Sequence, residues 1–165
     1  RPSCEAGGCW SSPAHSLCLP CNGSAWRSFQ GKMLMNGYPI YPVGRVHSKF
    51  KEPVSPELLR KSSCQIEIDE VWGEAAKDIQ VGDRLLVLFR FHVSESAPLR
   101  VHPRGDLSRP ITGIFSTCSP HRPNFIGVGD CRVTGREDLR FQVEGLDALD
   151  GSPVIDIKPF RFNEG

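Results

Sequence analysis

From Pro39 onward the chain is a series of short apolar runs separated by turn residues, and this pattern limits the folds it can adopt. In residues 64–68, cysteine and isoleucines alternate with polar residues, which is the period of a strand with one buried face. Similar runs occupy residues 40–46, 83–92, 113–116, 125–133, 140–144 and 154–157. Short strands at this spacing are typical of antiparallel sheets. The residues therefore predict a mainly β protein, a barrel or sandwich of about seven strands.

Helix is expected to be the minority element. Residues 55–61 begin with Ser55, a good N-cap, followed by Pro56, whose fixed φ suits the first helical position. A second short helix is predicted over residues 71–78, ahead of a turn at residues 81–83. No run approaches the roughly 20 apolar residues of a membrane-spanning helix, so we predict no membrane partner.

Residues 1–38 differ from the rest because turn residues recur every few positions and no run is periodic. We predict a flexible extension here and a domain over residues 39–161. An alternative is that this segment lies upstream of the natural start, and that Met33 or Met35 is the true first residue. It lacks the basic start and apolar middle of a secretory signal, so the cytoplasm is the expected compartment.

Four of the seven cysteines fall in this extension, at Cys4, Cys9, Cys18 and Cys21. Four thiolates can hold zinc in a tetrahedral site. Only one pair has the tight spacing of a zinc knuckle, so we predict no metal and keep a structural zinc site as the alternative.

The near-zero net charge of +1 hides two oppositely charged segments. Residues 99–136 hold six arginines against two aspartates, a net charge of +4, whereas residues 137–165 hold three basic and seven acidic residues, a net charge of −4. Guanidinium groups match phosphate oxygens well, so the arginine-rich segment favours phosphate recognition. A solvated surface that pairs with the acidic segment is the alternative.

Three motifs carry side chains suited to a site. Residues 115–127 carry hydroxyls, an imidazole, a guanidinium and a carboxamide, and Pro120 and Pro123 exclude regular structure there, which favours a rigid binding loop over a simple connection. Residues 149–160 contain the turn Asp150-Gly151, and residues 88–92 end an apolar strand with a histidine. Taken alone, the last two are read most simply as a hairpin turn and a structural histidine.

Together these motifs resemble the TsaA-like domain family, the β-barrel tRNA methyltransferases that act on threonylcarbamoyl-adenosine. The resemblance covers about residues 39–160 and rests on residues 39–40, Gly44-Arg45-Val46-His47-Ser48, Phe89-Arg90-Phe91-His92, Gly113-Ile114-Phe115, Ser119-Pro120-His121-Arg122-Pro123-Asn124, Ile126-Gly127 and residues 150–159. It implies a small antiparallel β-barrel that binds S-adenosylmethionine in loops at one end, near a homodimer interface. The implied reaction moves the sulfonium methyl to N6 of threonylcarbamoyl-adenosine beside the anticodon of a tRNA.

By position in the motifs, the resemblance implies cofactor contacts at His47, Ser48, Lys49, His92, Val93, Cys118, Val128, Asp150, Gly151, Ser152 and Pro153. Contacts to tRNA are expected from Arg100, Arg104, Ser119, His121, Arg122 and Lys158. Asn124 and Asp156 are the candidates for orienting the proton of the substrate nitrogen.

Two positions depart from the family pattern. Cys118 stands where many members carry an arginine, and Phe125 where a proline often follows the asparagine. Without the two-pronged guanidinium of an arginine, the expected cofactor contact at residue 118 is weaker. A non-catalytic barrel that binds RNA or another ligand is therefore the alternative function.

Overall fold

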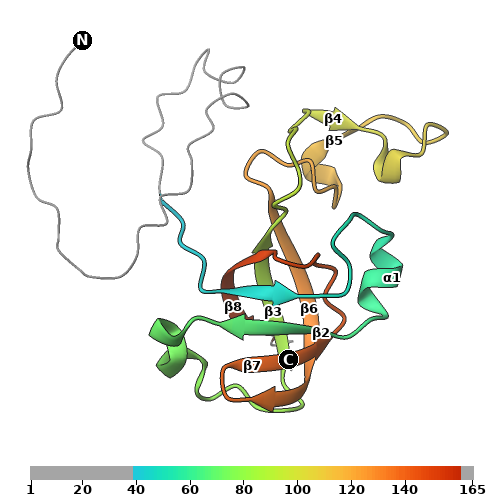
Figure 1. Cartoon of the computed structure of the whole chain (residues 1–165). Helices are drawn as coiled ribbons and strands as arrows, with labels where there is room; N and C mark the ends of the chain where they lie inside the picture. Colours follow the sequence, from blue (N-terminus) through green and yellow to red (C-terminus); the bar gives the residue numbers. More distant parts are fainter. Residues whose placement is uncertain (1–38, 161–165) are drawn as a thin grey trace, which may run out of the picture. The chain divides into compact units, whose positions relative to one another are not determined.

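The computed structural model describes residues 39–160, whose main feature is a closed antiparallel barrel of six strands (Figure 1). The order around the barrel is β1-β2-β7-β6-β3-β8. The strands are β1 (Gly44–His47), β2 (Cys64–Ile68), β3 (Arg84–Arg90), β6 (Ile126–Glu137), β7 (Arg140–Glu144) and β8 (Pro153–Pro159). The predicted class is confirmed, with six barrel strands in place of about seven. The predicted extension, its cysteines and the two methionines lie outside the described residues.

The core lies inside the barrel and comes from the alternation seen in the sequence. Along β3, Leu85, Val87 and Phe89 are buried, while Leu86 and Leu88 between them face outward and are half-buried. Burying one such apolar side chain contributes about 1.5–3 kcal/mol. The other fully buried side chains of the barrel interior include Val46, Ile66, Val133, Phe141, Val143, Leu146 and Val154.

The first predicted helix is confirmed as α1 (Pro56–Arg60), where the Leu58 N–H donates to Ser55 Oγ (3.3 Å) as an N-cap should. The second is a 3₁₀ helix, η1 (Glu70–Ala76), without a side-chain cap at Asp69. Only Ala76 of this segment is buried, so no apolar stripe holds it as an α-helix. Among the described residues, no helix is long and apolar enough to cross a membrane.

The predicted strand at residues 113–116 is wrong beyond its first residue. Thr112–Gly113 (β5) pairs with Arg100–Val101 (β4) in a separate two-stranded sheet, and Ile114–Ser116 then turns as the 3₁₀ helix η3. The turn is closed by the Thr117 N–H, which donates to the Ile114 carbonyl (3.1 Å). We call residues 94–117 the arm; it includes a further short 3₁₀ helix, η2 (Pro103–Gly105), and lies beyond one end of the barrel (Figure 1).

Candidate functional site

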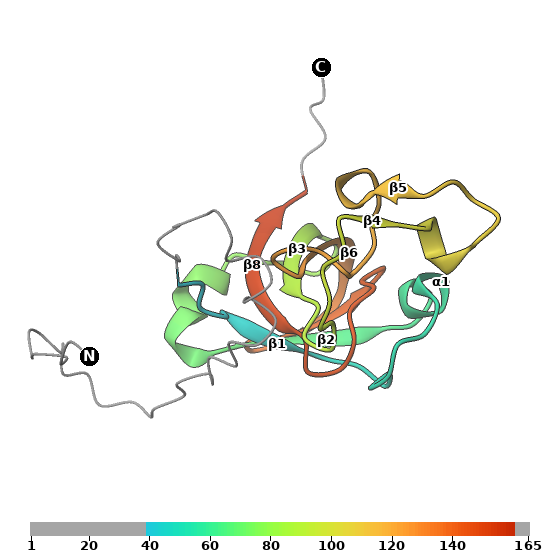
Figure 2. The ribbon, with the colours of Figure 1, turned by 90° about the horizontal axis from the view of Figure 1, so that it is seen from above.

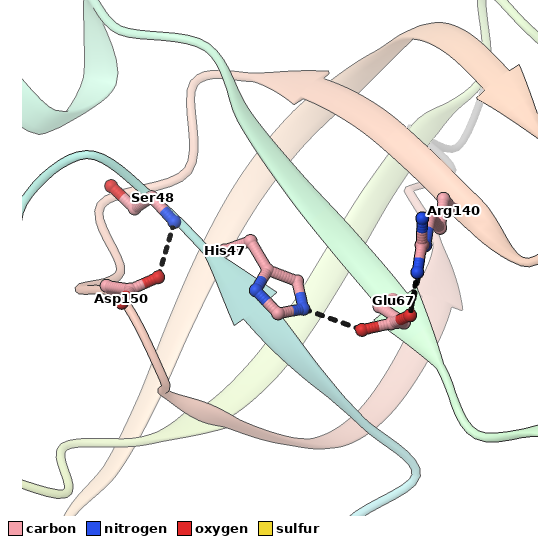
Figure 3. Close-up of polar contacts among 5 residues, drawn as sticks. All are labelled: His47, Ser48, Glu67, Arg140 and Asp150. Carbon is pink, nitrogen blue, oxygen red and sulfur yellow. Dashed lines mark hydrogen bonds and ion pairs between the residues drawn. The ribbon is translucent and has the colours of Figure 1, made fainter.

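Four loops meet at the barrel end that carries the arm: those that follow β1 and β3 and those that precede β6 and β8 (Figure 2). Asp150, in the loop before β8, links two of them. The Ser48 N–H donates to Asp150 Oδ1 (3.0 Å), and the Asp150 N–H donates to the Phe50 carbonyl (2.8 Å). The adjacent Gly151 N–H donates to the Val46 carbonyl (2.8 Å). The structure thus joins residues 48–50 to residues 150–151, and Figure 3 shows Ser48 beside Asp150.

The predicted turn at residues 150–151 is present, and it places Ser152 against the loop after β3. Gly151 has φ +77°, a value that favours glycine over residues with a Cβ. Ser152 is 2% exposed, and its hydroxyl is hydrogen-bonded to His92 Nδ1 (3.3 Å). The predicted cofactor residues Ser48, His92 and residues 150–152 therefore lie in one connected cluster, which we call the loop cluster.

The cluster shifts the protonation of its histidine. Loss of hydration, followed by the nearby Arg90 guanidinium, lowers the pKa of His92 below its ordinary value of 6.5, and the Asp150 carboxylate opposes the shift. His92 is therefore neutral at pH 7, and a neutral imidazole does not repel a cationic ligand.

This shift predicts a pH dependence of stability. Because the unfolded chain binds a proton at His92 more readily than the folded one, the free energy of unfolding should fall as pH drops through 6.5. Urea unfolding at a series of pH values measures this. His92→Gln, which does not titrate, should show a smaller fall over the same range; an equal fall in both proteins contradicts the assignment.

The loop of residues 117–125 is fixed by its own side chains and by β3. Arg122 Nη1 donates to the Thr117 carbonyl (2.7 Å), and the Phe91 N–H donates to the Phe125 carbonyl (2.8 Å). His121 Nδ1 and Ser96 Oγ are hydrogen-bonded (3.2 Å). The predicted rigid binding loop is thus a bonded unit attached to the arm and to the end of β3.

Phe125 has an unusual backbone conformation, with φ +53°. Proline is restricted to φ near −65° and could not adopt this conformation. A bulky side chain at positive φ costs about 1–2 kcal/mol. The N–H of Phe125 also donates to the Arg122 carbonyl (3.1 Å), a bond that proline cannot make.

We expect Phe125→Pro to lower the free energy of unfolding by about 2 kcal/mol, because proline can adopt neither this φ nor this hydrogen bond. Phe125→Gly is the control, since glycine keeps both and loses only the half-buried ring. Thermal unfolding measures the two variants. A proline variant as stable as the glycine variant contradicts the strained loop.

His47, predicted to contact the cofactor, points elsewhere. Its Nε2 donates to Glu67 Oε2 (2.7 Å), and Arg140 donates to Glu67 Oε1 (2.8 and 3.0 Å), all on the outer wall of β1, β2 and β7 (Figure 3). Hydrogen bonds from Arg140 first and His47 second lower the pKa of Glu67. Only the main chain of His47 therefore borders the loop cluster, and the Glu67–Arg140 partnership was not foreseen.

The remaining predicted cofactor residues lie around the cluster without a hydrogen bond that joins them to it. Lys49 places Nζ 5.0 Å from the Phe50 ring centroid. Cys118 and Val93 are exposed on their loops, and Val128 faces outward on β6 with 54% of its surface exposed. Pro153 begins β8 beside β1.

Sequence reasoning missed Arg60, which ties α1 to the loop before β8. Its guanidinium donates to Asp147 Oδ2 (2.7 and 3.2 Å), and Asp147 raises the pKa of Arg60. A basic residue in the last turn of a helix is common, so its position in α1 did not mark Arg60 as a residue of the site.

The two proposed proton-orienting residues are not brought together. Asn124 is exposed on the loop before β6. Asp156 forms an ion pair with Lys158 on β8 (2.7 Å) and lines a cavity of about 610 Å³ with Lys158, Trp72 and Phe160. This cavity lies beside η1 and the carboxyl end of β8, away from the loop cluster.

The arginines predicted to meet tRNA lie on or beside the arm. Arg100 donates to the Ile111 carbonyl (2.9 Å), and Arg104 forms an exposed ion pair with Glu57 of α1 (3.1 Å). Ser119 Oγ accepts from the His121 N–H (3.3 Å) within the binding loop. These contacts leave the basic groups on the same end of the molecule as the loop cluster.

The donor set of the cluster fits an adenosine-type cofactor. A carboxylate accepts about four hydrogen bonds and Ser48 uses one of those sites on Asp150, so the group can also receive ribose hydroxyls. Main-chain groups of the connected loops and exposed apolar residues such as Val93 surround it. Loops fixed in this way suit a ligand whose reacting carbon must be aligned.

Comparison with known proteins identifies the family. Residues 44–163 match the family described as tRNA-methyltransferase O N-terminal domain. The chain belongs to this family. The stated resemblance is therefore confirmed, and it covers the barrel, the arm and the loop cluster.

Related proteins agree with this assignment. A probable S-adenosyl-L-methionine-binding protein of Methanothermobacter thermautotrophicus is 43% identical over 125 residues, 73% of this chain and 88% of the relative. One of Pyrococcus abyssi is 31% identical, over 72% of this chain and 66% of its own length. A crystal structure of TrmO from Pseudomonas aeruginosa superposes with a TM-score of 0.58 at 32% identity, covering 78% of this chain and 58% of that chain. The chain thus spans less than two thirds of two of these relatives.

Proposed function

We propose that this protein is an S-adenosylmethionine-dependent tRNA methyltransferase that methylates N6 of threonylcarbamoyl-adenosine beside the anticodon. Family membership supports the reaction class, and the names of the relatives support the cofactor. The observation that carries the proposal is the hydrogen-bonded cluster of Ser48, His92, Asp150 and Ser152 at one barrel end. A tRNA substrate also favours the cytoplasm as the site of action.

The chain's residues would act mainly by holding and aligning. Bound S-adenosylmethionine would supply a methyl group on a sulfonium. Asp150 and the main chain of residues 48–50 would hold the adenosine part, and neutral His92 would leave the sulfonium without a repelling charge. Asn124, exposed on the loop before β6, is the better placed of the two residues considered for orienting the substrate proton. Asp156 is already paired with Lys158.

Methyl transfer from labelled cofactor tests the proposal. Purified full chain is incubated with tRNA that carries threonylcarbamoyl-adenosine and with the same tRNA lacking the modification. Label in the modified tRNA alone, found on N6 by nucleoside analysis, supports the proposal. Cofactor binding by calorimetry without label in either tRNA supports the non-catalytic barrel, for which the exposed Cys118 in place of an arginine is the motivating observation.

We propose a homodimer as the working form. Val128 on β6 and Leu88 on β3 pair in register and both face outward, so the barrel wall carries exposed apolar area next to the site. Apolar area of this kind is typical of an interface. Sedimentation velocity should give a dimer, and Val128→Lys should shift it toward monomer. A monomeric wild-type chain refutes the proposal.

A further inference from the structure

The side chain of Phe115 is 78% exposed on the arm, where Leu107 is also exposed (80%), and of the two only Phe115 carries an aromatic ring. It lies in η3 on the arm, two residues before Thr117, where the binding loop begins. Because the benzyl group is exposed, its burial against a partner would still contribute free energy.

The backbone under Phe115 is rigid. Its neighbour Ile114 is 2% exposed and anchors the turn, and the Ile114 N–H donates to the Leu99 carbonyl (3.0 Å). The Thr117 hydroxyl and N–H both donate to the Ile114 carbonyl (2.9 and 3.1 Å). The ring is therefore presented on a pinned turn, which lowers the entropy lost when a ligand stacks on it.

Two guanidinium groups are hydrogen-bonded to carbonyls that precede and follow Phe115 in the chain. Arg100 donates to the Ile111 carbonyl (2.9 Å), four residues before Phe115, and Arg122 donates to the Thr117 carbonyl (2.7 Å), two residues after it. A guanidinium has five N–H donors, and one carbonyl uses only part of them. Each group therefore keeps donors that can reach a phosphate.

An exposed aromatic ring on a turn that is flanked in the sequence by carbonyls holding two guanidinium groups has the chemistry of a nucleobase-stacking platform. The surrounding charge agrees, because residues 99–122 contain four arginines and one aspartate, a net charge of +3. Such a charge attracts a polyanion more than an apolar protein surface.

We propose that Phe115 stacks on an unpaired base of the anticodon loop, while Arg100 and Arg122 hold the flanking phosphates. The inference rests on the proposed function, since it names the residue that positions that RNA. Phe115 acts on binding and orientation, and it takes no part in the chemical step.

The test uses the full chain, an anticodon stem-loop RNA carrying threonylcarbamoyl-adenosine, and three variants. Phe115→Ala should raise KM for the RNA, and its Kd by fluorescence anisotropy, about tenfold, with kcat within about twofold. Phe115→Trp should restore both constants, because indole also stacks. Leu107→Ala is the matched control, an equally apolar arm residue that is 80% exposed, and it should bind like wild type.

The outcomes separate the two proposals. Wild-type methyl transfer with an unchanged Kd for Phe115→Ala overturns the stacking role and leaves the proposed function standing. An equal loss in Leu107→Ala, or a Phe115→Ala variant that changes oligomeric state in sedimentation, also overturns it in favour of a protein contact. A wild-type chain that transfers no methyl group refutes the proposed function, whatever the anisotropy shows.

Discussion

Asp150→Ala is expected to lower kcat/KM for methyl transfer by about 100-fold. The substitution removes the acceptor of the Ser48 N–H and the carboxylate proposed to receive the ribose hydroxyls. Hydrogen bonds to a charged group contribute about 1.5–3 kcal/mol each, and 1.4 kcal/mol is a factor of ten. The measurements are steady-state kinetics with labelled cofactor and cofactor Kd by calorimetry, and most of the loss should appear in the Kd.

Asp150→Asn separates the two roles of this side chain. Its carboxamide oxygen can still accept from Ser48, so the loops stay connected, but the charge is lost. We expect a loss of about tenfold, between wild type and alanine. Circular dichroism and thermal unfolding of both variants serve as the folding control. Wild-type cofactor binding by Asp150→Ala would remove Asp150 from the site.

Gly44→Ala should have the largest effect on stability, about 3 kcal/mol lost from the free energy of unfolding. Gly44 pairs with Ile68 of β2 and with Val154 of β8. A Cβ added to Gly44 would overlap the main-chain carbonyl oxygen of Glu67. Main chain in a closed barrel cannot move aside as a side chain can, so relief would cost strand pairing. Urea unfolding measures the change.

Gly113→Ala is the matched control for this prediction. It lies on the arm, has an ordinary φ of −59°, and an added Cβ would meet no atom within 4 Å. Its free energy of unfolding should equal that of wild type or exceed it by up to about 1 kcal/mol, through loss of unfolded-state entropy. A Gly44→Ala protein as stable as this control would contradict the prediction, because it would show that β1 and β2 can move apart without loss of stability.

Local patterns predicted the parts of the fold that depend on neighbours in the chain. The strands at residues 64–68 and 140–144 and the cap at Ser55 are as predicted, because alternation and capping chemistry act over a few residues. The strand predicted at residues 113–116 failed, because η3 buries Ile114 and bonds its N–H to the Leu99 carbonyl, fifteen residues away, a contact that alternation alone does not reveal.

The candidate site divides in the same way. Motifs indicated Ser48, His92 and Asp150, and the fold connects them through hydrogen bonds. The partners of His47 could not be predicted, because Glu67 is twenty residues away and Arg140 seventy-three beyond Glu67. Side-chain direction on β1 is set by which face the closed barrel buries.

Alternation and motif order are properties of the chain alone, and they were enough to predict the class of fold, the family and the loops that carry the site. Which side chains meet depended on the fold. It paired Asp156 with Lys158 beside a cavity away from the loop cluster, and it left Phe115 exposed next to the binding loop. The physical reason is that closing the barrel joins strands far apart in sequence, and those pairings fix the direction of each side chain.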